Sequence, residues 1–498
     1  MRIVLICAPI MDLSAEEGRL VPIGQDSPPS IPNLAVHLLA GVLRNHDHAV
    51  SVLDLTAAGS ERIDPHLPLL HSAQLVGISA TTLNWPTVLS VAAQLRKANV
   101  AAPLVLGGIH PTMFPDYILR RYPVDFIIRS EGERALLELC RALQKGERLN
   151  EIGNLSWRTR SGQVVHNDSA TMLSVEEMTA LPLPAYDLLT PGAYPTVSLQ
   201  SSRGCAFNCC FCSTSFRRSY RGIPPSAFVE KLVLVQTMVT GRVQNPHVVE
   251  IVDDEWSLNR KRTLAILEEL DRRGVSVKFT FDSRANDFLD SEERYVAAVA
   301  PRMEQFLLGA ECGYDEGLKR IGKGTTVAKL EACARLLRKY GIAERAEFSF
   351  ILGLPWETKK EVLRTVQFAA HLALEYGVRP LLQWYYVMPG SLLWRDIWRT
   401  GAVTPAMYDE FGFFRNLYLF KTGVGLAAEE MWDIMDIIST TKGLLRVARE
   451  HEHAIQSSSP TPMALNFPLP ALGAQEDSAT PLVWQRSPAR EADRRPAL

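Results

Sequence analysis

The chain has 498 residues, of which 53 are basic and 55 acidic, with 47% hydrophobic and 22% charged residues. A formal charge of −2 argues against a protein whose surface as a whole binds nucleic acid or a membrane, and the length suits about three globular domains. No window reaches the roughly 18 apolar residues of a membrane span. The short apolar N-terminus is more typical of a buried strand than of a signal peptide. Eight cysteines in a chain of this length are too few for a disulfide scaffold. We therefore expect a cytoplasmic protein with reduced thiols.

The first 145 residues alternate apolar runs with amphipathic stretches. This rhythm predicts a parallel, doubly wound sheet with strands at 2–7, 49–55, 75–80, 103–108 and 124–129, and with helices near 34–45, 86–98, 115–121 and 133–143. Ligands of such sheets bind beyond the carboxyl ends of the strands. Those ends carry Pro9, Ser79, Thr81, Gly107, Gly108 and the turn "SEGE" at 130–133. The Gly-Gly pair predicts either a close approach to a ligand or only a tight turn.

The alternation stops and later resumes. Residues 146–195 hold a hairpin pattern, "SWRTRSGQVVHND", and a proline-rich connector, and we interpret them as a linker. Strands are then predicted at 196–202, 247–254, 275–282, 305–311, 346–353 and 381–387, with helices at 226–239, 259–273, 291–300, 326–340 and 358–376. This predicts a partial (β/α)6 barrel over 196–390, followed by a small helical segment at 391–455 and a disordered tail at 456–498.

Four of the eight cysteines lie in "RGCAFNCCFCS", directly after the first barrel strand. Cys205, Cys209 and Cys212 have C-x3-C-x2-C spacing, and Cys210 is adjacent to Cys209 and faces another way. Structural zinc needs four ligands, whereas a [4Fe–4S] cluster held by three thiolates keeps one iron open for a substrate. Chemistry alone favours the cluster and leaves zinc open.

This segment resembles the signature of the radical S-adenosylmethionine (SAM) superfamily, including the aromatic Phe211 before the last cysteine. The resemblance implies that Cys205, Cys209 and Cys212 bind a [4Fe–4S] cluster whose open iron binds the amino and carboxylate groups of SAM. An electron from an external donor such as flavodoxin or ferredoxin would then cleave SAM to a 5′-deoxyadenosyl radical. Cys210 lies outside the signature, and we expect it to pack against the barrel.

Further barrel motifs extend the resemblance. They are "VDDEW" at 252–256, "FDSRAND" at 281–287, "LLGAECG" at 307–313, "FSFILGLPWET" at 348–358 and "VMPGSLLWRDI" at 387–397. The SAM-binding residues that they imply are Asp254, Glu255, Arg284, Glu311, Ile351, Gly353 and Glu357.

The N-terminal half resembles the cobalamin-binding domain of class B radical SAM enzymes, through "GGIHPTMFPD" at 107–116 and "VDFIIRSEGE" at 124–133. The resemblance implies that cobalamin lies at the carboxyl edge of the sheet, facing the barrel mouth. The residues that would contact it are Pro9, Ser79, Thr81, Gly107, Gly108, His110, Glu131 and Gly132. The segment D-x-H-x-x-G that often ligates cobalt is absent, so the lower axial ligand is not identified. We expect His37 on a helix face and His110 to donate or accept a hydrogen bond.

Taken together, the resemblance implies an enzyme that methylates an unactivated carbon of a small natural-product, lipid or tetrapyrrole-like substrate. Cyclisation or rearrangement without methyl transfer is the alternative, because fold does not fix the reaction. A tRNA methylthiotransferase is disfavoured, since only Cys7 and Cys140 precede the barrel. A cobalamin-binding sensor or structural zinc module would leave the barrel motifs unexplained.

Two sets of residues could contact the substrate. Arg217, Arg218 and Arg221 could bind an anion or be solvated, and the aromatic side chains at 383–390 and 408–420 could line a pocket, although we expect them to pack. The sequence identifies no catalytic acid or base and no oligomeric state.

Overall fold

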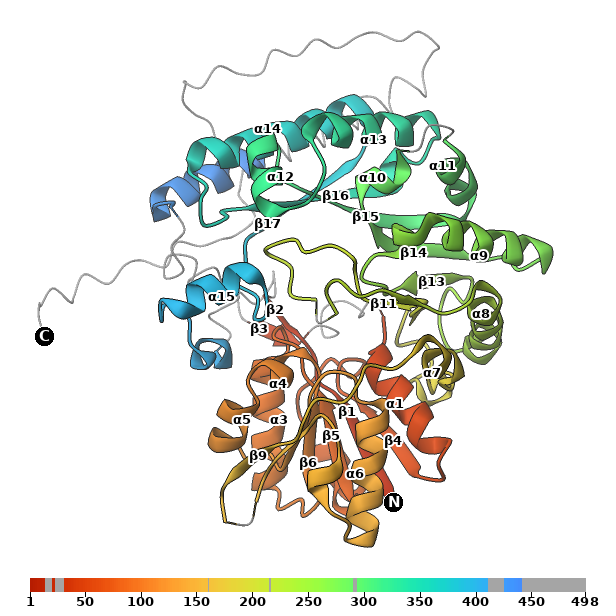
Figure 1. Cartoon of the computed structure of the whole chain (residues 1–498), viewed down its shortest axis with the longest axis vertical. Helices are drawn as coiled ribbons and strands as arrows, with labels where there is room; N and C mark the ends of the chain where they lie inside the picture. The colour runs from red at the N-terminus through yellow and green to blue at the C-terminus, as the bar shows by residue number, and fades with distance from the viewer. Residues whose placement is uncertain are drawn as a thin grey trace, which may run out of the picture.

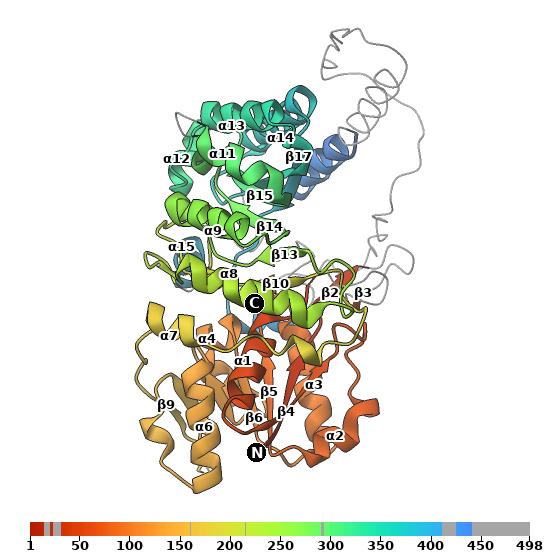
Figure 2. The same ribbon diagram turned by 90° about the vertical axis from the view of Figure 1, so that its right-hand side faces the viewer.

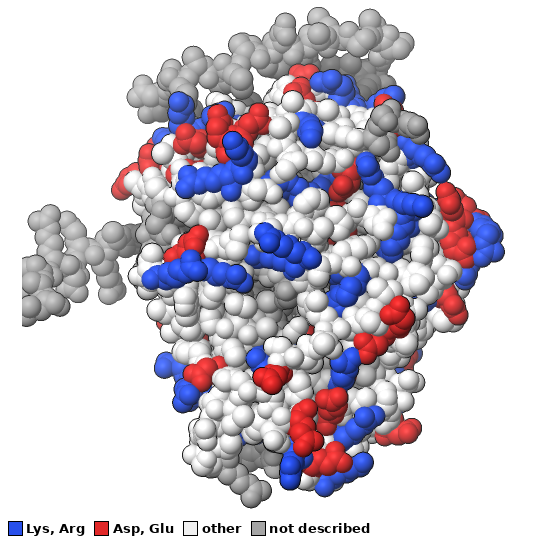
Figure 3. Space-filling view, viewed as in Figure 1, with Lys and Arg blue, Asp and Glu red and all other residues white. Residues whose placement is uncertain are grey.

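The computed structural model describes residues 1–13, 20–22, 31–159, 161–214, 216–289, 293–410 and 425–440. Two α/β domains are stacked along the long axis of the molecule, the N-terminal domain below the barrel (Figures 1 and 2). On the face shown in Figure 3, basic and acidic side chains are intermixed over both domains. Within the described ranges, no helix has both the length and the apolar character needed to cross a bilayer.

The N-terminal domain is built on a seven-stranded sheet of order β4-β1-β5-β6-β7-β8-β9. The five strands from β4 to β7 are parallel, as predicted. They are β1 (Arg2–Cys7), β4 (Ala49–Asp54), β5 (Leu75–Ser79), β6 (Leu104–Gly107) and β7 (Phe126–Ile128). The hairpin of β8 (Leu155–Arg158) and β9 (Val164–His166), predicted as part of the linker, instead adds to β7 in antiparallel pairing.

Helices cover both faces of this sheet because its strands are apolar on both sides. One face packs against α1 (Leu34–Arg44) and α6 (Glu133–Lys145), and their apolar residues join Ile3, Leu5 and Val105 in one core. The α6 stripe of Leu136, Leu139 and Cys140 has helical spacing. The other face carries α3 (Trp85–Lys97) and the short helices α2 (Leu67–Ser72), α4 (Ile109–Met113) and α5 (Pro115–Arg121).

The second domain is an open barrel of six parallel strands in the order β10-β13-β14-β15-β16-β17, as predicted. The strands are β10 (Val197–Leu199), β13 (Val248–Ile251), β14 (Lys278–Ser283), β15 (Met303–Glu311), β16 (Ala346–Leu352) and β17 (Arg379–Trp384). The helices between them are α8 (Pro225–Val239), α9 (Arg260–Arg272), α10 (Ala285–Phe288), α11 (Arg294–Val299), α12 (Asp315–Ile321), α13 (Val327–Lys339) and α14 (Lys359–Tyr376). Buried phenylalanines pack the strands against the surrounding helices, as where Phe306 stacks on Phe288 of α10 and Phe350 contacts Phe368 of α14.

Short elements lie at the boundary between the two domains (Figure 1). They are the hairpins β2 (Met11–Leu13) with β3 (Leu20–Pro22) and β11 (Ser202–Arg203) with β12 (Arg221–Gly222), and the helices α7 (Val175–Ala180) and α15 (Leu392–Arg399). After α15, a 3-10 helix at Pro405–Asp409 places the Asp409 carboxylate against the N-terminal domain, where Trp85 Nε1 donates to it at 2.8 Å. Residues 428–440 are helical. The predicted tail at 456–498 and most of the aromatic run at 408–420 lie outside the described residues.

Candidate cofactor sites

The cysteine-bearing loop leaves the barrel between β11 and β12, which pair in antiparallel fashion at its base. Gly204 begins the loop with φ +88°, and a Cβ there would lie 2.0 Å from the carbonyl oxygen of Ser219, so only glycine fits. The carboxylate of Asp254, after β13, accepts from the Gly204 amide at 2.8 Å and from the Thr214 hydroxyl. Asp254 therefore holds both ends of the cysteine segment.

The three signature thiols have a cationic neighbour. Cys209 is buried, and Arg284 places Nη1 3.8 Å from its Sγ while stacking on Phe207, with the guanidinium carbon 3.6 Å from the ring centroid. Burial raises the pKa of Cys205 to about 11 and also raises the pKa of Cys212. Because iron binds the thiolate, loading the cluster must release these protons.

Cys210 differs from the signature cysteines because its backbone anchors the loop. Its amide donates to the Ile321 carbonyl at 3.0 Å, and its own carbonyl accepts from the Leu393 amide at 3.0 Å. These bonds tie the loop to the end of α12 and to α15. Within the described part of the chain, no three Cys, His, Asp or Glu side chains are grouped closely enough to hold a single metal ion. A cubane has a different requirement, since each thiolate binds a different iron.

The predicted SAM residues from β13 to β15 meet at the barrel mouth. Glu255 is buried, its pKa is raised well above the ordinary value mainly by burial, and it accepts from the Ser257 amide at 3.2 Å and the Ser283 hydroxyl at 3.3 Å. Glu311 ends β15 with φ +65° and is ion-paired at 2.7 Å with Lys323. Both partners are less than one-tenth exposed. Lys323 was not predicted, since only the folded loop after α12 brings it to Glu311.

The residues predicted after β16 divide into two kinds. Ile351 is half-buried near the end of the strand. Gly353 has φ +77°, and its amide and that of Leu354 both donate to one Glu357 oxygen, at 2.8 and 2.9 Å. The other oxygen accepts from Tyr314 at 2.8 Å. The Glu357 carboxylate thus stabilises the turn through these hydrogen bonds. Any effect of Glu357 on SAM binding would therefore act through the backbone of Gly353.

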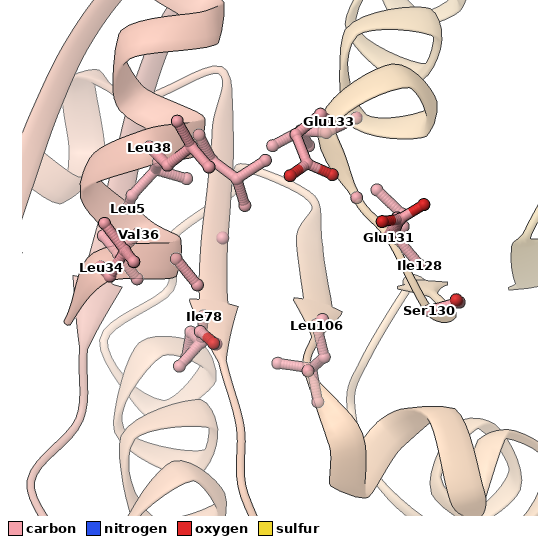
Figure 4. Close-up of a pocket in the computed structure, with 18 of the residues that line it drawn as sticks. Leu5, Leu34, Val36, Leu38, Ile78, Leu106, Ile128, Ser130, Glu131 and Glu133 are labelled. Carbon is pink, nitrogen blue, oxygen red and sulfur yellow. The ribbon is translucent and has the colours of Figure 1, made fainter. Parts of the chain in front are cut away.

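A cavity of about 360 Å³ lies at the carboxyl edge of the N-terminal sheet. Leucines and Val36 from α1 form one wall, and Ile128 and the turn at 130–133 form the opposite wall (Figure 4). A Cβ added to Gly107 would meet only the Ile128 carbonyl, at 3.8 Å, so the glycine leaves this space open. The barrel domain closes the cavity with Gln200, Arg203, Phe216 and Val252.

Five of the residues predicted to contact cobalamin line this cavity, namely Ser79, Gly107, Gly108, Glu131 and Gly132. Pro9, Thr81 and His110 do not line it. His110 is fully buried, with Nδ1 3.2 Å from the Thr82 hydroxyl and its ring stacked on Trp85, and burial lowers its pKa to about 3. His37 is likewise buried, with Nδ1 2.8 Å from the Asn33 carbonyl oxygen. The described lining contains no histidine.

The other candidate substrate residues have structural partners. Arg217 donates to the Gly390 carbonyl at 3.1 Å, and Arg221 forms an ion pair with Glu131. Arg218 is exposed. Tyr385 is buried, and Trp384 Nε1 donates to the Met435 sulfur, so these two aromatic residues pack as expected.

Comparisons with known proteins agree with this geometry. The B12 binding domain family matches residues 21–140, and the Radical SAM superfamily matches residues 199–369. The chain is 31% identical to "Uncharacterized methyltransferase PH0819" of Pyrococcus horikoshii over 73% of this chain and 78% of that protein. It belongs to the cobalamin-binding radical SAM enzymes. The implied cofactors are a [4Fe–4S] cluster, SAM and cobalamin.

Two further relatives show the range of this family. The chain is 27% identical to the anaerobic magnesium-protoporphyrin IX monomethyl ester cyclase of Synechocystis, over 64% of each chain. The solved structure of the radical SAM methyltransferase TsrM from Kitasatospora setae, with cobalamin and a [4Fe–4S] cluster bound, superposes with a TM-score of 0.61 at 19% identity. It covers 80% of this chain and 75% of that one. At that identity the likeness shows the shared fold.

The residues present fit the implied groups. The cysteine loop offers three thiols beside a cation, and the cavity offers an apolar, glycine-lined space between the domains. Cys205, Cys209 and Cys212 would hold the cluster. Ser79, Gly107 and Gly132 would border cobalamin.

Proposed function

We propose that this radical SAM enzyme methylates an unactivated carbon of a small molecule. One observation carries the proposal: the cavity at the carboxyl edge of the N-terminal sheet is walled on its barrel side by Arg203 and Phe216, which flank the cysteine segment on either side. A methyl carrier and a radical source would therefore face the same substrate. When bound, the cluster supplies the electron that cleaves SAM, and cobalamin supplies the methyl group.

The chain's own residues would position the reactants. Buried Arg284 lies beside Cys209, and buried Lys323 is paired with Glu311. These two cations would attract the carboxylate of SAM and would offset the negative charge of the cysteine thiolates and Glu311 around it. Gly353 lets the chain turn after β16. A Cβ built on this glycine would lie 3.0 Å from the Trp384 ring, so the turn packs closely against the end of β17. The similarity to a protein named a methyltransferase supports methyl transfer.

The reaction needs an outside reductant. We propose a flavodoxin or ferredoxin and a reducing, cytoplasmic setting, which the absence of disulfides among all eight cysteines supports. A nucleic-acid substrate is not part of the proposal, because the chain as a whole carries a formal charge of −2.

The test uses anaerobically reconstituted enzyme with cobalamin, a low-potential reductant, candidate substrates and SAM with a deuterated methyl group. Mass spectrometry should find 5′-deoxyadenosine and a product with the labelled methyl group. A product without the label, formed together with 5′-deoxyadenosine, would favour the second candidate, cyclisation, which the similarity to a cyclase supports. Absence of 5′-deoxyadenosine despite a complete cluster would contradict both.

A further inference from the structure

The turn at 130–133 of the N-terminal domain contacts both strands at the base of the cysteine loop. In the β11–β12 pair, Arg203 lies directly opposite Arg221. Both guanidinium groups reach the same carboxylate, since Arg203 Nη1 lies 2.8 Å and Arg221 Nη1 3.0 Å from Glu131 Oε1. One side chain of the N-terminal domain thus joins the two ends of the loop that carries the cysteines.

A second carboxylate of the turn completes the contact. Arg203 Nη2 donates to Glu133 Oε1 at 2.5 Å, and Arg203 Nε donates to Gln200 at 2.7 Å, so each nitrogen of this guanidinium has a partner. Glu131, Glu133 and Arg203 are less than one-tenth exposed, and Arg221 is 12% exposed. Two negative and two positive charges are buried together at the domain boundary. A buried charge that loses its partner is strongly unfavourable, so these four side chains must move together.

Three of these four residues also line the cavity. Glu131, Glu133 and Arg203 are part of its lining, whereas Arg221 is not. Figure 4 shows the Glu131 and Glu133 carboxyl groups on the wall opposite Leu34 and Leu38. A ligand that fills the cavity therefore contacts three of the four charged side chains, and these in turn fix the base of the cysteine loop.

We propose that Glu131, Glu133, Arg203 and Arg221, here called the interdomain network, are positioning residues that transmit occupancy of the cavity to the cysteine loop. Cobalamin in the cavity restricts the rotamers of Glu131, Glu133 and Arg203, and the loop that binds the cluster becomes more rigid. The network thereby aligns the cluster with cobalamin without touching the reacting atoms. This inference rests on the assignment of cobalamin to the cavity.

The test measures hydrogen–deuterium exchange of the full-length, cluster-loaded protein under anaerobic conditions, with and without hydroxocobalamin. Cobalamin binding is followed separately by visible absorbance. In the wild type we expect cobalamin to slow amide exchange in peptides covering 203–222 by at least about fivefold. Arg221→Met replaces no residue that lines the cavity, so cobalamin should still bind while the slowing falls below about twofold.

Two further variants keep the test decisive. Asp187→Asn breaks the Arg44–Asp187 ion pair, which is 2.7 Å long and lies away from the cavity, and should preserve the full slowing. Arg221→Lys keeps the charge on a single donor group and should give an intermediate value if Arg221→Met does not fold. Wild-type protein that binds cobalamin without any change in loop exchange would overturn the inference, as would full slowing in Arg221→Met. Failure of the wild type to bind cobalamin would remove the cofactor assignment itself and the inference with it.

Discussion

The barrel mouth and the N-terminal cavity are built in opposite ways, although they lie on either side of one domain boundary. At the mouth, Glu255, Arg284, Glu311 and Lys323 are buried ionisable side chains, and Glu311 is ion-paired with Lys323. The cavity wall consists mainly of aliphatic side chains and glycines, and its charge is confined to the turn at 130–133 and Arg203. Buried charges suit a small charged ligand such as SAM, and an apolar space suits a large one that is bound mainly through its shape. Each site should therefore still load its own cofactor when a substitution disables the other, while the interdomain network couples the mobility of the two.

Cys209→Ala is expected to give the largest difference between the two sites. Removing this thiolate leaves two cysteines for the cluster, so iron loading and SAM cleavage should be lost completely. Cobalamin binding should persist, because Cys209 does not line the cavity. Iron analysis and 5′-deoxyadenosine formation measure the first effect, and visible absorbance the second. Cys210→Ala is the matched control and should retain iron. Loss of iron in that control would place Cys210 among the ligands.

Lys323→Met tests the charged character of the mouth. The substitution leaves the Glu311 carboxylate buried without its partner at 2.7 Å, and the free energy of unfolding should fall by about 3–5 kcal/mol. Denaturant unfolding of the apoprotein measures this change. Adding Glu311→Gln should recover most of the loss, since the uncompensated charge is then gone. A double variant as unstable as the single one would show that packing of the lysine stem, and not its charge, is what matters.

Gly107→Leu tests the apolar character of the cavity. Within 4 Å the new Cβ would meet only the Ile128 carbonyl, so the rest of the side chain would project into the cavity, and cobalamin affinity should fall at least about 100-fold because the displaced volume cannot be recovered elsewhere. Equilibrium binding followed by absorbance measures this, and iron content should not change. Gly132→Ala adds one methyl group with contacts of 3.8 Å and should have a much smaller effect. Equal affinity in Gly107→Leu and the wild type would place cobalamin elsewhere.

The smallest expected effect concerns His110, which lies outside both sites. Its pKa is lowered to about 3 by burial, so the unfolded chain binds a proton below pH 6.5 that the folded chain does not. Stability from this residue is complete above pH 6.5 and is lost as the pH falls towards 3. Between pH 7.5 and 5.5 it should account for about 1.4 kcal/mol of lost stability. Unfolding of wild type and His110→Phe at both pH values isolates that share, and equal pH dependence in the two proteins would contradict the burial argument.

Much of the fold could be predicted because it depends on local patterns. The predicted strands at 2–7, 49–55 and 75–80 correspond to β1, β4 and β5 within a residue, and α14 matches the predicted range 358–376 almost to the residue. The β8–β9 hairpin was recognised, but its place in the N-terminal sheet was not. That place depends on pairing with β7, and such pairing has no local signal.

The sites were predictable to a smaller extent for the same reason. Strand ends placed Ser79, Gly107 and the turn at 130–133 at the cavity, because the carboxyl ends of parallel strands share an edge. Lys323 and Arg203 were missed, since their partners lie on other elements and Arg203 pairs with residues some 70 positions away. His110 follows the Gly-Gly turn, yet its ring is directed to Trp85 and away from the cavity.

The most direct test of two separate cofactor sites is iron and cobalt analysis of one anaerobic preparation, reconstituted with iron, sulfide and hydroxocobalamin. We predict about four iron atoms and about one cobalt atom per wild-type chain, cobalt without iron in Cys209→Ala, and iron without cobalt in Gly107→Leu. Wild-type protein that loads iron but no cobalt, or that loses both metals in either variant, would contradict the account.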